Sequence, residues 1–397
     1  MENLNSEKNN KVSFIAGYLL SAFGYEFIFF VMTVYIFNLT QSAINIGIFT
    51  SILAFTKIFL PFSGTITDRF NKEKSFGIAL IITGVLVILL FFLNNIYLVY
   101  ILWFIISFFF TFIVNVRTAL MTEIMPAESF LKGNSTVFVA LNVAKILAPL
   151  TGGLLTSYFE TKILFLFTGG IYFIAFFVTR YITLPVEKQQ LVKRARAIDQ
   201  IQEALAFLKN NSELKSLGLL LIARTLFLGF QITLYVTYIK SFLKLGSSEY
   251  GIFLTASAMG SIIGSLIAPY ILRRANRYAV IVFTLPVHYI AFILLGLNTN
   301  YYFALLIIFI SSLIFYMSAI SIHSIRDSST ARHLRGTVYG TIMALSAPIS
   351  VVSMIVGGLI INAFGVDKIL IFSGTMSIIS MVIIGFVFRK KINWIFA

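Results

Sequence analysis

Few ionisable side chains lie inside the long apolar stretches of this sequence, and they are where chemistry is expected. They are Glu26, Lys57, Lys145 and Arg224. A carboxyl group in such surroundings can exchange a proton, because burial opposes its charge while a nearby cation supports it. Glu26 is therefore the candidate proton carrier. A second interpretation stays open, in which Glu26 forms a structural salt bridge with Lys145 or Lys57.

Polar and aromatic residues recur at helical spacing in the same stretches, which is typical of the wall of a pocket for an apolar ligand. Arg117 is a further candidate cavity charge, although it lies off the polar stripe of its helix and could instead extend its guanidinium toward water. Most of the charged residues inside the apolar stretches are basic, which favours an amphipathic neutral or anionic ligand over a strictly cationic one. The candidate cavity residues are Asn115, Phe227, Gln231, Tyr235, Ser312 and Tyr316.

The composition identifies the elements that must carry these residues. Hydrophobic residues make up 59% of the chain, charged residues make up 11%, and the mean hydropathy is +0.94. A water-soluble surface needs far more ionic coverage, so the chain is an integral membrane protein. The net charge of +15 lies in short loops between apolar runs, where it orients helices, so no nucleic-acid partner is expected.

Metal and cofactor sites are not expected. Cysteine is absent, which excludes disulfides and thiolate ligands. The only imidazole ligands are His288, His323 and His333. There is also no nucleotide-binding P-loop, no zinc-binding histidine pair on one helix turn and no convincing pair of aspartates inside the apolar runs, so neither direct ATP drive nor an intramembrane enzyme is expected.

Twelve apolar runs are long enough to cross a bilayer, which takes about 20 residues of helix each. We therefore predict an all-α integral membrane fold. The opening residues 1–11 are polar, and the run that follows lacks the features of a cleaved signal peptide, so we expect it to be retained. The predicted helices cover residues 12–37, 43–63, 75–93, 96–121, 135–158, 163–184, 214–238, 250–272, 278–297, 301–324, 337–364 and 368–388.

Basic residues predict the orientation of these helices. When alternate loops are assigned to opposite sides, one side keeps only Lys162, Lys240, Lys244 and Lys368, and the others gather on the opposite side. By the positive-inside rule both termini are cytoplasmic, and the protein is a multi-pass protein of the cell (inner) membrane.

One long connection, residues 185–213, separates a predicted N-terminal six-helix bundle, residues 1–184, from a C-terminal six-helix bundle, residues 214–397. Within the connection Ile198, Ile201, Leu205 and Leu208 recur at helical spacing behind a basic cluster. This pattern suits an amphipathic helix on the anionic inner leaflet, and a solvated linker is the alternative.

The prolines indicate an internal repeat. Pro61, Pro149, Pro269 and Pro348 fall in the second, fifth, eighth and eleventh predicted helices, which are the middle members of successive triplets. Nested repeats of this kind are typical of secondary transporters, whose substrate sites lie near the midplane where the repeats meet.

Residues 64–74, with the sequence GTITDRFNKEK, resemble the loop between the second and third helices of the major facilitator superfamily. The resemblance implies two six-helix bundles that alternate access to a central site. It also implies a cytoplasmic gate formed by Gly64, Asp68, Arg69, Lys72 and Lys74. In that gate Asp68 faces the start of helix eleven and latches the outward-facing state, as a carboxylate at a helix N-terminus can.

Two further likenesses point toward exporters. Ala148, Pro149, Gly152 and Gly153 resemble the proton-antiporter motif in the fifth helix of the family's exporters, where small residues permit a bend and close packing. Residues 39–43, 125–128 and 203–208 show a weaker likeness to the macrolide and multidrug proton-antiporter branch.

These features predict a secondary active transporter that exports amphipathic small molecules of the drug or macrolide type by proton antiport. One alternative is an exchanger or flippase for an anionic metabolite or lysophospholipid. An alternative of another class is a non-transporting membrane receptor or scaffold. The expected partners are the lipid bilayer, a small-molecule substrate and protons, and we expect a monomer.

Overall fold

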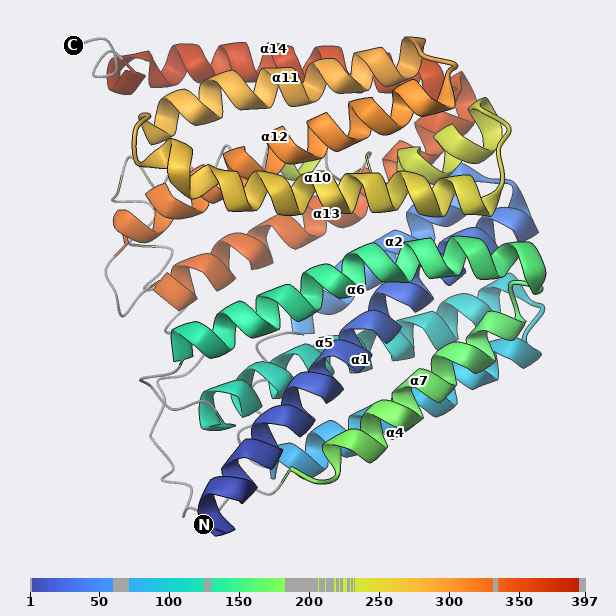
Figure 1. Cartoon of the computed structure of the whole chain (residues 1–397). Helices are drawn as coiled ribbons and strands as arrows, with labels where there is room; N and C mark the ends of the chain where they lie inside the picture. The colour runs from blue at the N-terminus through green and yellow to red at the C-terminus, as the bar shows by residue number, and fades with distance from the viewer. Residues whose placement is uncertain are drawn as a thin grey trace. The chain divides into compact units, whose positions relative to one another are not determined.

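The computed structural model describes residues 2–59, 71–124, 130–182, 206, 211, 218, 221, 224–226, 229, 231, 233–330 and 335–392. Every regular element in these ranges is helical (Figure 1). Four predicted site residues, Gly64, Asp68, Arg69 and Phe227, lie outside them. Pro61 and the predicted amphipathic positions of the 185–213 connection also lie outside the described residues.

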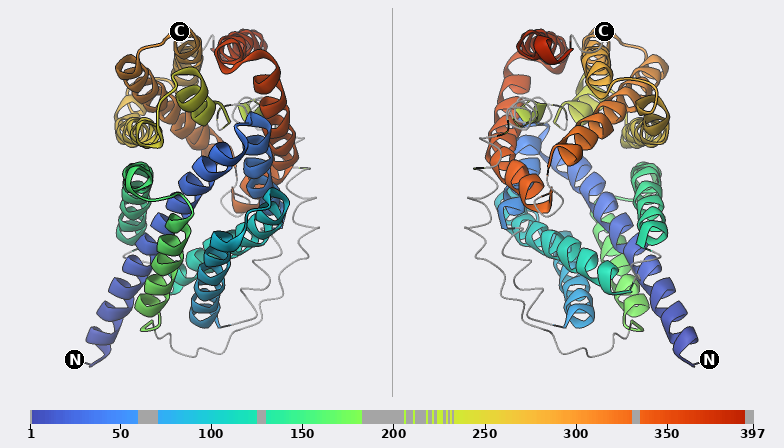
Figure 2. Two further views of the ribbon diagram at one scale, coloured as in Figure 1. Left: turned by 90° about the vertical axis from the view of Figure 1, so that its right-hand side faces the viewer. Right: turned by 90° about the vertical axis from the view of Figure 1, so that its left-hand side faces the viewer.

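The helices of the first half lie on the predicted runs, but α1 begins at Glu2 and not at the predicted residue 12. In chain order they are α1 Glu2–Thr40, α2 Ala43–Thr56 with the 3-10 turn η1 Lys57–Phe59, α4 Lys72–Leu89 with the 3-10 turn η2 Leu90–Phe92, α5 Ile96–Ile124, α6 Phe130–Tyr158 and α7 Ile163–Thr179. The first turns of α1 project beyond the ends of neighbouring helices in Figure 2. At a rise of about 1.5 Å per residue α1 exceeds the thickness of a bilayer core.

In the second half, helical residues 233–237 lead into a π-helical turn, η3 Tyr238–Phe242. The helices that follow are α10 Ser247–Leu272, α11 Arg277–Leu297, α12 Tyr301–Ser328, α13 Arg335–Phe364 and α14 Val366–Ile392. Polar side chains define where three of them begin. Asn276 accepts a hydrogen bond from the Tyr278 N–H, Asn300 accepts one from the Phe303 N–H, and the Glu249 carboxylate accepts one from the Gly246 N–H.

Eight described helices are long and apolar enough to cross a membrane, and the segments Ala43–Phe59 and Ile163–Thr179 are shorter apolar helices. The all-α membrane fold is therefore confirmed. The count of twelve spans remains a prediction, since the predicted seventh helix is described only in part.

Contacts divide the chain into two compact units. The first is Met1–Gln41 with Ile52–Lys193, and the second is Ser42–Ser51 with Arg194–Ala397. In the first unit α1 packs on α6 and α7, and α4 packs on α7. Gly17 and Gly24 allow the approach of α7, because a Cβ on Gly24 would lie 3.1 Å from the Tyr172 ring and one on Gly17 would overlap Thr179. These small residues therefore lie on a packing face of α1.

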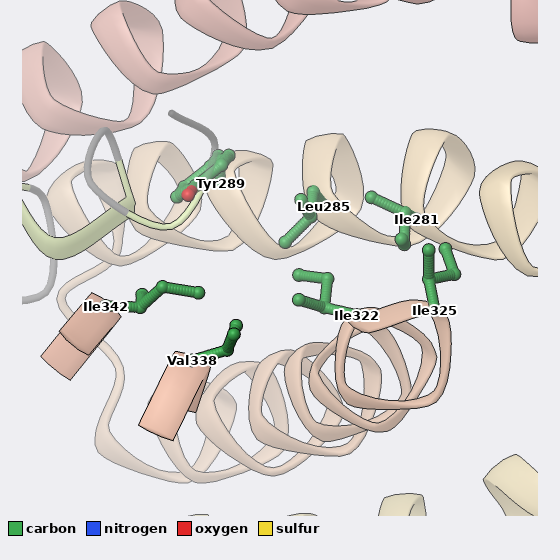
Figure 3. Close-up of a cluster of buried hydrophobic side chains, with 7 residues drawn as sticks. All are labelled: Ile281, Leu285, Tyr289, Ile322, Ile325, Val338 and Ile342. Atoms are coloured by element: carbon green, nitrogen blue, oxygen red, sulfur yellow. The ribbon is translucent and has the colours of Figure 1, made fainter. Parts of the chain in front are cut away.

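In the second unit α10 packs on α12, and α11 packs on both α12 and α14. Gly260 and Gly264 permit the close approach of α10 to α12, since a Cβ on either would overlap the α12 backbone, at Phe309 and Leu313 respectively. A buried apolar cluster joins α11, α12 and α13, as Figure 3 shows. Its members are Ile281, Leu285, Tyr289, Ile322, Ile325, Val338 and Ile342.

Three of the four repeated prolines fall inside the predicted helices. Pro149 lies within α6, Pro269 within α10 and Pro348 within α13, and Pro286 lies within α11. A helix proline removes one backbone hydrogen bond and bends the helix locally. These three repeated prolines therefore fall in corresponding helices of the last three predicted triplets.

Candidate functional site

Glu26 lies in the central part of α1, within the apolar stretch of this helix, and is half-buried. The cations whose charge acts on its carboxylate are Lys145 of α6 and, more weakly, Arg117 of α5. Among the residues that the structure describes, no direct ion pair joins Glu26 to either cation. The carboxyl group is thus within the field of two bases without being locked to one of them.

Arg117 is buried, with 8% of its surface exposed, so its guanidinium does not extend to water. Its Cζ atom lies 3.8 Å from the centroid of the Tyr18 ring, which is a close cation–π contact. Its Nε has no hydrogen-bond partner in the part of the chain that the structure describes. The sequence allowed either a buried or a snorkelling arginine here, and the structure shows a buried one.

Aromatic rings complete this first group. Tyr25 meets the Phe110 ring edge-on at 5.0 Å between centroids, and Phe110 stacks on Tyr172 at 6.0 Å. The Tyr172 hydroxyl is buried and lacks a hydrogen-bond partner among the described residues. Electrostatically, Glu26 and Arg117 both act on Tyr172. An acid, two bases and three phenols therefore share the interior formed by α1, α5, α6 and α7.

The position of Lys145 depends on the packing of α6 against α1. Lys145 is half-buried, and the residues of the predicted bend, Ala148, Pro149, Gly152 and Gly153, are all buried. A Cβ on Gly152 would lie 2.5 Å from Cδ1 of Phe30 in α1. Glycine at this position lets α6 approach the helix that carries Glu26.

The remaining predicted residues of the first unit are less enclosed. Lys57 is exposed at the start of η1, and Asn115 is half-buried on α5. Lys72 forms an ion pair with Glu123, which joins the start of α4 to the end of α5, and Lys74 is exposed. Lys72 therefore has a partner within its own unit.

The second unit holds another buried guanidinium. Arg224 is 8% exposed, and its Cζ lies 3.9 Å from the centroid of the Phe315 ring on α12. Its Nε has no hydrogen-bond partner among the described residues. Tyr289 and Tyr316 are the groups that act on it electrostatically. Both are phenols, so neither supplies the negative charge that a carboxylate would.

Beside Arg224 a chain of hydrogen bonds crosses the unit. The Nε2 atom of His288, on α11, lies 3.0 Å from Nε2 of Gln231. Its Nδ1 atom lies 2.8 Å from the hydroxyl and 3.2 Å from the carbonyl oxygen of Ser311 on α12. Because both ring nitrogens have partners, the imidazole is held in one orientation. Gln231, predicted as a cavity residue, therefore serves at least as a link between helices.

The other predicted cavity residues of this unit lie near the same helices. Tyr235 is half-buried between the rings of Phe253 and Phe292, at 5.5 and 6.4 Å between centroids. The Ser312 hydroxyl lies 2.7 Å from that of Ser257 on α10. Tyr316 is half-buried beside Phe315.

Sequence reasoning missed several members of both groups. It considered His288 only as a possible metal ligand, and it gave no role to Tyr18, Tyr25, Tyr172 or Ser311. A histidine within an apolar stretch was the available signal, because such a group needs polar partners. The tyrosines carried no signal, since apolar helices contain many of them.

Comparisons with known proteins agree with this architecture. The sequence profile of the Major Facilitator Superfamily matches residues 14–350. No curated protein sequence matches the chain. A variant of the nucleoside transporter NupG has a similar structure, with a TM-score of 0.80 and 16% identity over 96% of this chain and 99% of that one.

Two further structures are similar at comparable levels. A bacterial homolog of the human lysosomal transporter Spinster, inward-facing and unoccupied, has a TM-score of 0.73 and 13% identity over 96% of this chain and 95% of that one. A bacterial homologue of the iron transporter ferroportin, inward-facing, has a TM-score of 0.72 and 15% identity over 94% and 98%. At these identities the likeness shows the fold, and the profile shows the family. The chain belongs to the Major Facilitator Superfamily of membrane transporters.

Proposed function

We propose that this transporter exports amphipathic small molecules in exchange for protons, with Glu26 as the proton-carrying group. The observation that carries this proposal is the position of Glu26 in the middle of α1, near two cations but paired directly with neither. The other acids in the described helices lie near helix ends, as Glu73, Glu123, Glu249 and Asp367 do. An ionisable group at mid-depth is costly to insert, and functional sites are where such groups are found.

Glu26 can couple proton and substrate through charge. Its enclosure opposes the carboxylate, while Lys145 and Arg117 support it, so a substrate that alters this balance changes whether the proton is held. A substrate that turns the positive end of a dipole toward the acid, with its anionic group held elsewhere, favours release of the proton. Re-protonation after the substrate leaves then resets the site.

Alternating access provides the route of transport, and the proton gradient sets its direction. We propose two six-helix bundles, residues 1–184 and 214–397, whose cytoplasmic gate includes Asp68 and its neighbours in the 64–74 loop. The gate, the cytoplasmic termini, the inner-membrane location and the monomeric state follow from the sequence pattern and the family resemblance. The helix-five bend, where Gly152 meets Phe30, supports close packing of the helix that carries Lys145.

A second candidate is exchange or flipping of an anionic metabolite or lysophospholipid. It is favoured by Arg224, a buried cation whose described neighbours include no carboxylate partner. The two candidates differ in whether transport requires a proton gradient. A receptor or scaffold without transport is not favoured by the family to which the chain belongs.

Reconstitution of the full chain into proteoliposomes tests the proposal. A panel of amphipathic compounds is assayed for uphill transport with and without an uncoupler, in wild type, Glu26→Gln and the control Glu160→Gln, whose side chain is exposed. We expect Glu26→Gln to lose uphill transport while still binding substrate, and we expect the control to retain it. Uncoupler-sensitive accumulation by Glu26→Gln at the wild-type level would remove Glu26 from the mechanism. If the uncoupler does not change transport by wild type, the second candidate, exchange or flipping of an anionic compound, is favoured.

A further inference from the structure

The guanidinium of Arg224 is the most costly unpaired group that the structure describes in the second unit. It is nine-tenths buried, and one of its faces is covered by the Phe315 ring. Buried arginine in a membrane protein normally pairs with an acid or with backbone carbonyls. No ion pair to Arg224 occurs among the described residues, and its Nε donates to none of them.

The surroundings of Arg224 are polar but neutral. Tyr289 and Tyr316 act on it, and it in turn acts on His288. The hydrogen bonds of His288 are already used, because Gln231 and Ser311 occupy its two ring nitrogens. These neighbours hold three helical segments together without neutralising the cation.

Stacking on Phe315 leaves the edge of the guanidinium for another partner. The N–H groups of arginine point outward in the plane of the group, and they match the two oxygens of a carboxylate or related oxyanion. The Phe315 ring lies against the guanidinium carbon and does not use these donors, and the half-buried Tyr316 lies next to Phe315. An oxyanion carried on an apolar body would satisfy both the donors and the aromatic wall.

We propose that Arg224 anchors the acidic group of the transported molecule, and that the substrate class is an amphipathic oxyanion. This inference rests on the proposed transport function and specifies its substrate. The acidic group can belong to a free organic acid or to the head group of a lysolipid, since both present oxygens to the same donors. Arg224 then has a binding role, and the His288 chain positions the helices around it.

Equilibrium binding to the purified full chain in uncharged detergent tests this assignment. The probes are 4-fluorobenzoate and its neutral analogue 4-fluorobenzamide, followed by fluorine NMR at pH 7.5. We expect wild type to bind the benzoate at least about 10-fold more tightly than the benzamide, because charge-assisted hydrogen bonds are the stronger ones. Lysophosphatidylglycerol and an uncharged monoacylglycerol of the same chain length form the second pair, which tests the lipid source of the same chemistry.

Variants locate the site. Arg224→Gln should bind the anionic and neutral members of each pair alike. Arg273→Gln should keep the wild-type preference, and it is a matched control because Arg273 lies over an aromatic ring, that of Tyr270, but on the exposed surface. If Arg224→Gln does not fold, Arg224→Lys should retain the preference for the anion but reduce it several-fold, because it loses the planar fork.

The outcomes separate cleanly. A preference for benzoate assigns a free organic acid, and a preference confined to lysophosphatidylglycerol assigns a lipid head group. If wild type shows no anion preference in either pair, or if the preference survives in Arg224→Gln, the proposal is wrong. No gradient is present in this measurement, so its failure is distinct from a failure of proton coupling.

Discussion

The contact between Gly152 and Phe30 gives a prediction whose sign and size follow from the structure. Replacing Gly152 by alanine places a Cβ 2.5 Å from Cδ1 and 3.0 Å from Cε1 of Phe30. The ring would have to retreat by roughly 1 Å to reach an ordinary van der Waals contact. Phe30 is 1% exposed, so there is no open space into which it can move. We expect the substitution to force α6 and α1 apart.

The magnitude is the difference between two opposing effects. Overpacking a filled interior costs about 1 to 3 kcal/mol. Replacing a helical glycine by alanine recovers roughly 0.5 to 1 kcal/mol of conformational entropy. Gly152→Ala should therefore lower the free energy of unfolding by up to about 2.5 kcal/mol. Gly170→Ala in α7 is the control, because a Cβ there has no neighbour within 4 Å. It should raise stability by about 0.5 to 1 kcal/mol.

Thermal unfolding of the purified chain in detergent measures both effects. The two alanine variants should shift the midpoint in opposite directions. Adding Phe30→Leu to Gly152→Ala should restore part of the loss, since a smaller side chain gives the new methyl group room. Equal shifts for Gly152→Ala and Gly170→Ala, or no rescue by Phe30→Leu, would mean that α6 does not depend on this contact.

Three further substitutions test the proposed roles of single charges. If Lys145 faces the substrate, Lys145→Ala should reduce export of an anionic compound more than that of a matched neutral one; equal loss for both with a shifted pH optimum would instead tie Lys145 to Glu26. Asp68→Asn should shift the population toward inward-facing forms, since a carboxylate at a helix start contributes about 0.3 to 2 kcal/mol. Labelling of single cysteines introduced into the cysteine-free chain reports that shift, and an unchanged ratio between the two faces would count against the latch. Lys72→Gln should lower the free energy of unfolding by at most about 1 kcal/mol, because its partner Glu123 is more than a third exposed. A larger decrease, measured by chemical denaturation, would contradict this expectation.

The helical architecture could be predicted because the bilayer imposes a simple rule on the sequence. A span needs about 20 apolar residues, so the ends of α5, α10 and α11 lie close to the predicted boundaries. The placement of prolines inside α6, α10 and α13 could also be predicted, because their positions relative to the apolar runs can be read directly from the sequence. The packing face of α1 could be inferred from its small residues, because only they permit close approach.

The pairing of side chains across helices could not be predicted in the same way. Arg117 lies off the polar stripe of its helix, yet the ring of Tyr18 covers its guanidinium. Helical periodicity gives the direction of a side chain but not the identity of the helix that it meets. His288 shows the same limit, since its partners lie 57 and 23 residues away in the chain. Such contacts depend on tertiary packing, which a single sequence does not encode locally.

The two buried arginines, Arg117 and Arg224, suggest that the two units bind different species. Each guanidinium lies on an aromatic ring from another helix of its own unit, and each has an Nε without a partner among the described residues. Their surroundings differ in their acids. The charge of Glu26 acts on Arg117, whereas no acid of the described residues is among the groups acting on Arg224. The first group is suited to hold a proton, and the second is suited to hold an anion.

Coupling between such groups does not require them to touch. If both the proton and the substrate bind one access state more tightly than the other, each biases the same equilibrium. Thermodynamic linkage then requires the effect of protonation on substrate affinity to equal the effect of substrate on proton affinity. Glutamine at residue 26 cannot gain or lose the proton, so substrate binding can no longer change protonation there. Loss of uphill transport with retained substrate binding is therefore the expected result for Glu26→Gln.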